Sequence, residues 1–240
     1  MNSKNRHTIT VFIPAYNEEI NLADAVSGAL NAVKNNFSKY EILILNAYSS
    51  DKTGKIAERL SDKNPNIRVI HRKNWHGLGA NVRKGIEQAT MEYFVMFPGD
   101  NENSWVSLSE TLNKIGSTDI IIPYTINNKA RSFYRRIISS WFVFLLNFLF
   151  RLKLKYYNGN AVYRTDMINK LHIHSKDFAY NAEILIKLIK SGYSYTEIGI
   201  YIQPTQKTAI FSIRNIVGVI RSVIYLFFDV NIISRNQYKY

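Results

Sequence analysis

Short apolar runs alternate with helix-type patterns along the first half of the chain, and this alternation limits the fold more than any other feature. The runs are rich in β-branched and aromatic residues, as strands are: ITVFIPA (9–15), YEILIL (40–45), IRVIH (67–71) and EYFVMF (92–97). The segments between them have helical spacing, such as the apolar face from Leu22 to Val33. Strands that alternate with helices of about 10–15 residues form right-handed βαβ units. The sequence therefore predicts an α/β fold with a mostly parallel sheet flanked by helices.

Length and cysteine content limit the architecture further. The chain has 240 residues and no cysteine. This length suits one domain with a C-terminal elaboration, and no Pro/Ser-rich linker divides it. The absence of cysteine excludes disulfides, thiol nucleophiles and Cys-based metal sites. The first ten residues, MNSKNRHTIT, contain no apolar signal region, so they do not indicate secretion.

The net charge of +13 predicts an anionic partner, which nucleic acid, a nucleotide or an anionic lipid surface would satisfy. No nucleic-acid reading motif accompanies the charge. The densest basic segments, RSFYRR (131–136) and RLKLKYY (151–157), instead bracket the most hydrophobic part of the chain. We therefore expect a membrane surface and no nucleic acid.

Polar loops follow all four runs: YNEE (16–19), NAYSSDKT (46–53), RKNWHGLG (72–79) and PGDNE (98–102). In a parallel sheet the carboxyl ends of the strands meet at one edge, and ligands bind there. Any one loop has a simpler explanation, because Ser49, Ser50 and Asp51 can cap the next helix and loops are commonly polar. The four loops together predict a binding site at this edge.

The same segments carry a family resemblance. VFIPAYNEE, SSDKT, GLGANVRKGI and PGDNE, in this order and spacing, resemble the motifs of family 2 glycosyltransferases of the GT-A fold, close to the polyprenyl-phosphate sugar transferases. The resemblance covers about residues 8 to 208. It implies a Rossmann-like GT-A domain in which residues 1–130 form the nucleotide-sugar-binding half. Residues 131–240 would form the acceptor-binding half of the same catalytic domain, with amphipathic helices at a membrane interface.

The resemblance also assigns a donor site. It implies that the nucleotide sugar contacts Pro14, Tyr16, Asn17, Glu18, Asn46, Asp51, Gly79, Arg83 and Asp100, and that Lys207 meets a phosphate group, that of the acceptor. Two adjacent acids usual in the family are replaced by Asn46 and Ala47, so an amide would make a contact normally made by a carboxylate. Asn17 and Glu18 would equally suit the start of the first helix. Gly79 and Arg83 lie at a helix N-terminus, which is a common anion site, although glycine can also serve a turn.

The segment PGDNE predicts a metal site. The family's Asp-x-Asp is altered here, with Pro98 in place of the first acid and Asp100 and Glu102 following. Mg²⁺ or Mn²⁺ bound by Asp100 and Glu102 would neutralise the diphosphate of the donor as the glycosidic bond breaks, and this gives Asp100 a catalytic role. The simpler alternative is that Asp100 and Asn101 are turn residues.

The second half contains two apolar stretches. The uncharged run 137–150 has fourteen residues, short of the roughly 20 that span a bilayer, and has basic residues at both ends. It predicts a helix lying in the membrane interface, with a buried core helix as the alternative. The second stretch, NIVGVIRSVIYLFF (215–228), is interrupted by Arg221, so it too is expected at the interface.

Two further residues complete the expected site. Glu183 corresponds to an acid that serves in some family members as general base, but a phosphate acceptor is already anionic and leaves Glu183 free to be structural. Lys207 is the basic residue remaining in QPTQKTAIFS, which matches a phosphate-binding motif of the family in degraded form, and it could equally be a surface lysine.

The expected function is inverting transfer of a sugar from a nucleoside-diphosphate sugar to a membrane-associated acceptor. Polyprenyl phosphate is the expected acceptor, and the expected location is peripheral, at the cytoplasmic face of the membrane. The departures at Asn46, Ala47 and Pro98 leave a second hypothesis, a non-catalytic nucleotide-sugar-binding protein of the same fold.

Overall fold

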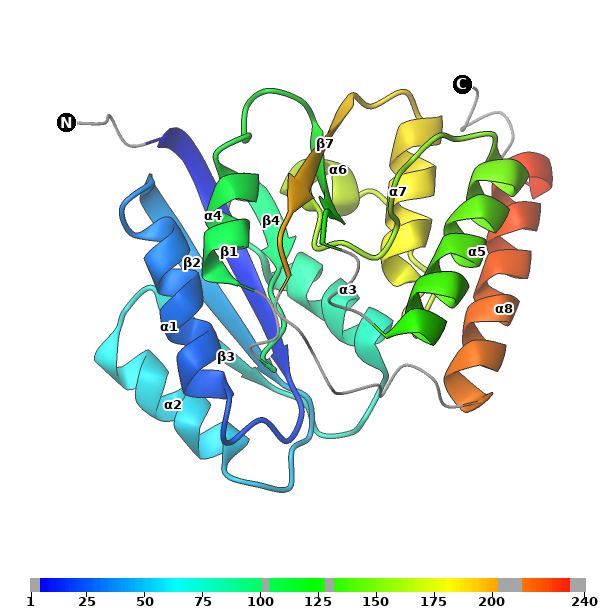
Figure 1. Cartoon of the computed structure of the whole chain (residues 1–240). Coiled ribbons are helices and arrows are strands. Elements are labelled where there is room, and N and C mark those ends of the chain that lie inside the picture. Colours follow the sequence, from blue (N-terminus) through cyan, green and yellow to red (C-terminus); the bar gives the residue numbers. More distant parts are fainter. Residues whose placement is uncertain (1–4, 101–103, 128–131, 203–212, 234–240) are drawn as a thin grey trace.

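The computed structural model describes residues 5–100, 104–127, 132–202 and 213–233. Within them, seven strands form one sheet in the order β3-β2-β1-β4-β6-β5-β7. Helices cover both faces of this sheet, so the molecule has three layers (Figure 1). The α/β prediction is confirmed.

The first four strands are parallel neighbours, as the alternating pattern predicts. They are β1 (Asn5–Ala15), β2 (Phe37–Asn46), β3 (Ile67–His71) and β4 (Tyr93–Met96). The crossover helices are α1 (Leu22–Val33), α2 (Thr53–Lys63) and α3 (Leu78–Gln88). Ala15 pairs with Asn46, and Asn46 with His71, so β1, β2 and β3 end at the same level. The loops that follow them are therefore neighbours at one edge.

Alternate residues of β1 supply the two cores. Ile9, Val11 and Ile13 pack beneath α1, α2 and α4 (Trp105–Leu112) on one face of the sheet. Phe12 points to the other face, where α3 and the helices of the second half pack. A strand buried on both faces must be apolar at successive positions, which is why the runs read as nearly continuous hydrophobic segments.

The second half of the chain continues the same sheet. It contributes β5 (Ile120–Thr125), β6 (Val162–Arg164) and β7 (Tyr195–Ile200). β6 is antiparallel to both β4 and β5, whereas β5 and β7 are parallel. The sequence patterns predict no strand at 162–164, because three residues are too few to show a periodicity.

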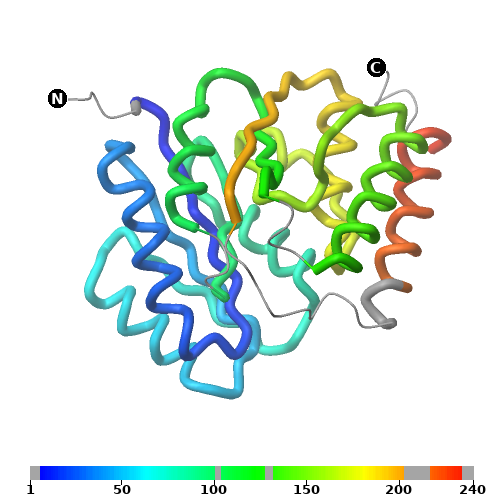
Figure 2. The backbone as a smooth tube through the Cα atoms, viewed as in Figure 1, coloured from blue at the N-terminus to red at the C-terminus, as the bar shows by residue number. Residues whose placement is uncertain are grey.

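Helices of the second half lie on the α3 side of the sheet. They are α5 (Phe133–Phe150), α6 (Thr165–Ile168), α7 (Tyr180–Lys190), α8 (Ile213–Phe228) and a π-helical turn, η3 (Asp229–Ile233). α5 and α8 lie side by side at the outside of this layer (Figures 1 and 2), and the rings of Phe150 and Phe227 are 6.3 Å apart. Figure 2 also shows that the two helices are far from α1 and α2.

Most of α5 faces outward. Leu146 and Phe150 are fully buried, but only 11% of the helix is buried overall. The buried-core alternative for residues 137–150 is therefore wrong. By length and composition α5 could cross a bilayer, a property that mostly buried helices of soluble proteins can share.

Candidate active site

The loops after β1 and β2 are joined by hydrogen bonds between their backbones and side chains. Asn17 donates its backbone N–H to Ser49 Oγ at 3.0 Å, and its side-chain oxygen accepts the N–H of Ser50 at 2.9 Å. In the same way, the N–H of Glu18 donates to Thr53 Oγ1 at 2.8 Å. The polar residues of YNEE and SSDKT thus hold the two loops together. Any contact of Asn17 or Glu18 with a nucleoside would be additional to this structural role.

Asp51 is the centre of this arrangement. Its carboxylate accepts the N–H of Thr53 at 2.9 Å, the hydroxyl of Thr53 at 2.5 Å and the N–H of Glu19 at 3.1 Å. Burial alone would raise the pKa of Asp51, but these hydrogen bonds outweigh burial and hold the pKa below its usual value. Asp51 is therefore ionised at neutral pH and stabilises the start of α2, as the capping alternative predicts.

Asn46 ends β2 as a largely buried side chain. Its oxygen accepts the N–H of Ser49 at 3.2 Å, and its amide nitrogen lies 3.1 Å from Nδ1 of His71. Since an amide NH₂ can only donate, His71 Nδ1 is the acceptor. Both ends of the amide are thus engaged in holding the loop, which differs from the expected contact with the nucleoside.

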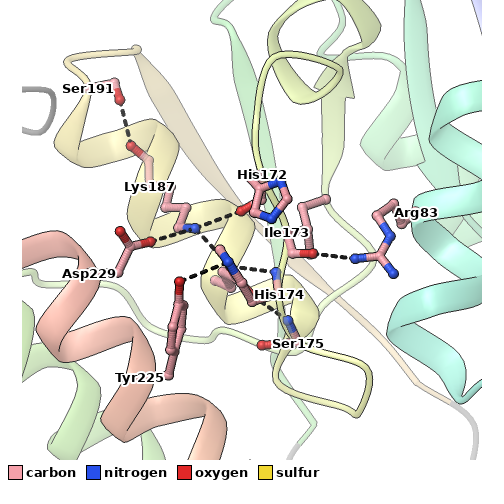
Figure 3. Close-up of polar contacts among 10 residues, drawn as sticks. Arg83, His172, Ile173, His174, Ser175, Lys187, Ser191, Tyr225 and Asp229 are labelled. Carbon is pink, nitrogen blue, oxygen red and sulfur yellow. Dashed lines mark hydrogen bonds and ion pairs between the residues drawn. The ribbon is translucent and has the colours of Figure 1, made fainter. Parts of the chain in front are cut away.

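The glycines before and within α3, where an anion was expected, contact another segment of the chain. A Cβ at Gly77 or Gly79 would overlap carbonyl oxygens of residues 175–176, and Gly79 donates its N–H to Lys176 O at 3.1 Å. Arg83 donates from Nη1 to Ile173 O at 2.6 Å, as Figure 3 shows. We call residues 172–177 the strap. Gly79 and Arg83 hold the strap, and the N–H of Gly79 that was expected at an anion site is taken.

The turn after β4 lies against the end of β1. Gly99 donates its N–H to Pro14 O at 3.3 Å, and a Cβ on Gly99 would lie 3.0 Å from the same oxygen. This glycine therefore lets the turn approach the YNEE loop closely. Asp100 follows it, half-buried, at the edge where the β1 and β2 loops lie.

The described residues fit a divalent ion only if the ligand supplies most of its coordination. Among them, no three His, Asp or Glu side chains gather at one point. Mg²⁺ and Mn²⁺ need only one or two protein carboxylates when diphosphate and water supply the other positions. Asp100 is one carboxylate at this edge of the sheet. Glu102, the second expected ligand, and Lys207 lie outside the described residues.

Glu183 is buried in an ionic cluster. Its carboxylate accepts the N–H groups of His174 and Ser175 at 2.9 and 2.8 Å, and Lys187 Nζ at 2.8 Å. Lys187 also lies 2.8 Å from the carboxylate of Asp229 in η3 and donates to His172 O at 2.7 Å (Figure 3). With a side-chain exposure of 1%, Glu183 is held away from solvent, which supports the structural alternative over a general base.

The charges of this cluster are maintained by one another. Burial alone would raise the pKa of Glu183, but the Lys187 ammonium and the two backbone N–H groups outweigh burial and lower it. Burial alone would lower the pKa of Lys187, but the carboxylates of Glu183 and Asp229 outweigh burial and raise it. Both groups are therefore ionised at neutral pH.

The strap also contacts α8. The hydroxyl of Tyr225 lies 2.8 Å from Nε2 of His174, and Ser222 donates to Asp177 at 2.9 Å. Burial and then the Lys187 ammonium lower the pKa of His174, so this imidazole is neutral at pH 7. The strap thus bridges α8, on the outside, and the start of α3, at the edge of the sheet.

The profile of glycosyl transferase family 2 matches residues 10–187, about three quarters of the chain. The chain belongs to glycosyl transferase family 2.

Two curated relatives align with about half of this chain. A dolichol-phosphate mannosyltransferase from Pyrococcus furiosus is 32% identical over 136 residues, which cover 55% of this chain and 38% of that protein. A dolichyl-phosphate beta-glucosyltransferase from Dictyostelium discoideum is 29% identical over 122 residues, covering 47% and 37%. This family 2 chain thus spans little more than a third of the length of these relatives.

Solved structures confirm the expected GT-A fold. Glucosyl-3-phosphoglycerate synthase from Mycobacterium tuberculosis, in complex with UDP, aligns with a TM-score of 0.68 at 13% identity, over 93% of this chain and 79% of that one. At this identity the likeness concerns the fold alone.

Some residues at the edge escape the family motifs. Tyr48 and Trp75 are exposed aromatic residues in the loops after β2 and β3, beside the expected Tyr16. The sequence signal that could have identified Tyr48 and Trp75 was an aromatic residue within an otherwise polar loop. For the cluster around Lys187 the only hint was helical spacing of Glu183 and Lys187, and nothing linked either to Asp229.

Proposed function

We propose that the protein is a glycosyltransferase that moves a sugar from a nucleoside-diphosphate sugar to a membrane-associated acceptor, with inversion at the anomeric carbon. The observation that carries this proposal is the family match over residues 10–187 together with the position of its motif loops at one edge of the sheet. The glucosyl-3-phosphoglycerate synthase structures support the donor class, because they contain UDP with Mn²⁺ or Mg²⁺.

Asp100, with Glu102, would hold Mg²⁺ or Mn²⁺ against the donor diphosphate. When bound, the ion would stabilise the negative charge of the leaving group. The turn that Gly99 packs against Pro14 supports this role, because it brings Asp100 to the edge of the sheet where the joined loops lie. These loops would present a rigid surface to the nucleotide, because their polar side chains already bind one another.

A lipid phosphate, such as polyprenyl phosphate, is the proposed acceptor. Two relatives are named for dolichol phosphate, which is an acceptor of this class. A phosphate oxygen that is already anionic needs no general base, and this agrees with a Glu183 that is buried and ion-paired. Lys207 remains our proposed contact to the acceptor phosphate.

A membrane surface would bring enzyme and acceptor together. α5 and α8 expose an apolar surface whose most exposed members are Phe133, Tyr134, Trp141, Phe144, Phe148, Val217, Ile220, Ile224 and Phe228. Basic residues adjoin it, including Arg151 and Lys153 after α5 and Arg221 on α8. Such a combination favours an interface rich in anionic lipid. We propose a peripheral position at the cytoplasmic face.

The Asp100→Asn variant tests the transferase. It keeps the shape of the side chain but removes the charge that would hold the metal, so transfer should fall on the order of 100-fold and lose its dependence on Mn²⁺. The assay measures transfer from a set of nucleotide sugars to short-chain polyprenyl phosphate, with Mn²⁺ varied. Asp62→Asn is the matched control, since Asp62 is an exposed acid near the end of α2.

Two outcomes would contradict the proposal. If the wild type neither transfers nor hydrolyses any nucleotide sugar, the protein is a non-catalytic relative. If Asp100→Asn has the wild-type rate and metal response, Asp100 does not hold the metal.

A further inference from the structure

Three aromatic side chains are exposed at the edge of the sheet where the motif loops lie. Tyr16 is 48% exposed, Tyr48 57% and Trp75 53%. The rings of Tyr16 and Trp75 contact each other, with centroids 4.6 Å apart and planes inclined by 50°. Exposed rings are costly to leave in water, so a paired set at one place is typical of a surface that binds something.

The sheet explains why these rings meet. Tyr16 follows the last residue of β1, and Trp75 follows β3 by four residues. β2 lies between these strands, and all three end level, so Tyr16 and Trp75 meet across the end of β2. Residues 59 positions apart in sequence therefore form one aromatic surface.

Two polar side chains of the loop after β2, Asn46 and Asp51, are engaged in holding the loops. Both ends of the Asn46 amide are bonded, and the carboxylate of Asp51 accepts three hydrogen bonds. Tyr48, whose φ is 66°, adopts the left-handed conformation that bulky residues rarely take, and the Asn46–Ser49 bond spans it. The turn that carries Tyr48 is thus held in place, and the three rings are an exposed aromatic part of this edge.

We propose that Trp75, together with Tyr16, forms the surface on which the nucleobase of the donor stacks. This inference rests on the proposed function and adds a residue to it, since no motif includes Trp75. Every nucleobase has a π-face, so stacking would bind bases of different identity, and aromatic side chains lose little conformational entropy when they bind. Because both ends of the Asn46 amide already have hydrogen-bond partners, this amide would contribute little to recognition of the edge of the base.

A simple structural role is the alternative, in which the Tyr16–Trp75 contact only holds the loops together. The two roles differ in which part of the ligand they affect. A stacking surface binds the base and leaves the diphosphate unaffected, whereas a disordered loop would weaken both.

The experiment compares ligands with and without a base. Binding of UDP, GDP, ADP and pyrophosphate, each with Mn²⁺, is measured by calorimetry for the wild type, Trp75→Ala, Trp75→Phe and Ile20→Ala. Ile20 is the matched control, because it is 84% exposed and follows YNEE directly. Loss of stacking in Trp75→Ala should weaken the binding of each nucleotide that the wild type binds by about ten-fold or more. The affinity for pyrophosphate should stay unchanged. Trp75→Phe should stay within about three-fold of the wild type, since it keeps a ring.

Tryptophan fluorescence gives an independent measurement. A base stacked on Trp75 should quench its emission in the wild type, and Trp75→Phe should lose that quenching while calorimetry still shows binding. Equal losses for pyrophosphate and nucleotides, or unchanged nucleotide affinity in Trp75→Ala, would each overturn the stacking role. Wild-type sugar transfer would continue in those cases, whereas a wild type without transfer contradicts the proposed function itself.

Discussion

Replacing Lys187 by methionine should strongly destabilise the fold. Methionine keeps much of the length of the side chain but removes the ammonium that lies 2.8 Å from both Glu183 and Asp229. The side chains of Lys187 and Glu183 are each 1% exposed, and that of Asp229 is 10% exposed. The variant therefore leaves two carboxylates in the interior without the cation between them.

The expected magnitude follows from this burial. Removing one partner of a buried ion pair typically costs about 3–5 kcal/mol, because the remaining charge cannot be solvated. In a domain of about 150–250 residues each kcal/mol lowers the melting temperature by roughly 2–4 °C. Lys187→Met should thus melt about 6–20 °C below the wild type at pH 7.

The destabilisation should shrink as the pH falls. In the wild type the pKa of Glu183 is lowered, so its ionic stabilisation is present above its unfolded pKa and is lost as pH falls through the folded pKa. Without the ammonium, burial would raise the folded pKa of Glu183 in the variant. As the pH falls, the Glu183 carboxyl is therefore protonated at a higher pH in the folded variant than in the unfolded chain. This protonation makes the folded variant more stable than it is at neutral pH. The two curves of unfolding free energy against pH should therefore converge below about pH 4.5.

Urea unfolding of the wild type and Lys187→Met between pH 4 and 8 measures this difference. Lys170→Met is the matched control, since Lys170 is exposed and a surface change of this kind is usually within about 0.5 kcal/mol. A difference of less than about 1 kcal/mol at pH 7, or one that stays constant with pH, would refute the account of the cluster.

Three further outcomes are expected. Gly79→Ala should cost about 1–3 kcal/mol in urea unfolding, because its Cβ would overlap backbone of the strap; a neutral effect would mean that the strap is loosely held. Asp51→Ala should cost about 1 kcal/mol at pH 7, and the loss should fade as pH falls through the lowered pKa of that carboxyl, so a loss that is equal at pH 3 would contradict the capping role. Changing Phe144, Leu145 and Phe148 together to Ser should abolish flotation with anionic vesicles while leaving the circular dichroism spectrum unchanged. Wild-type protein that does not bind such vesicles at low salt would contradict the proposed membrane-binding surface.

Local pattern was sufficient to predict the order of the elements. Strands buried on both faces must be apolar, and amphipathic helices must repeat every 3.6 residues, so ITVFIPA and the residues from Leu22 to Val33 reveal their structure without knowledge of any partner. The edge at which the loops gather also followed, since parallel strands joined by crossovers end on the same side. β6 was not predicted, because a strand of three residues is too short to show an alternation of apolar and polar residues.

Hydrogen-bond partners, in contrast, depended on the tertiary structure. Asn46, Gly79, Arg83 and Glu183 have the residue types of a ligand site, and the sequence alone could not show that their polar groups bind other parts of the chain. Arg83 meets Ile173, 90 positions away. A buried polar group must be satisfied by whatever lies beside it, and what lies beside it is decided by packing between elements. The sequence therefore determined the family, the sheet and the edge that carries the site, and only the folded chain decided which of the polar residues at that edge hold the structure.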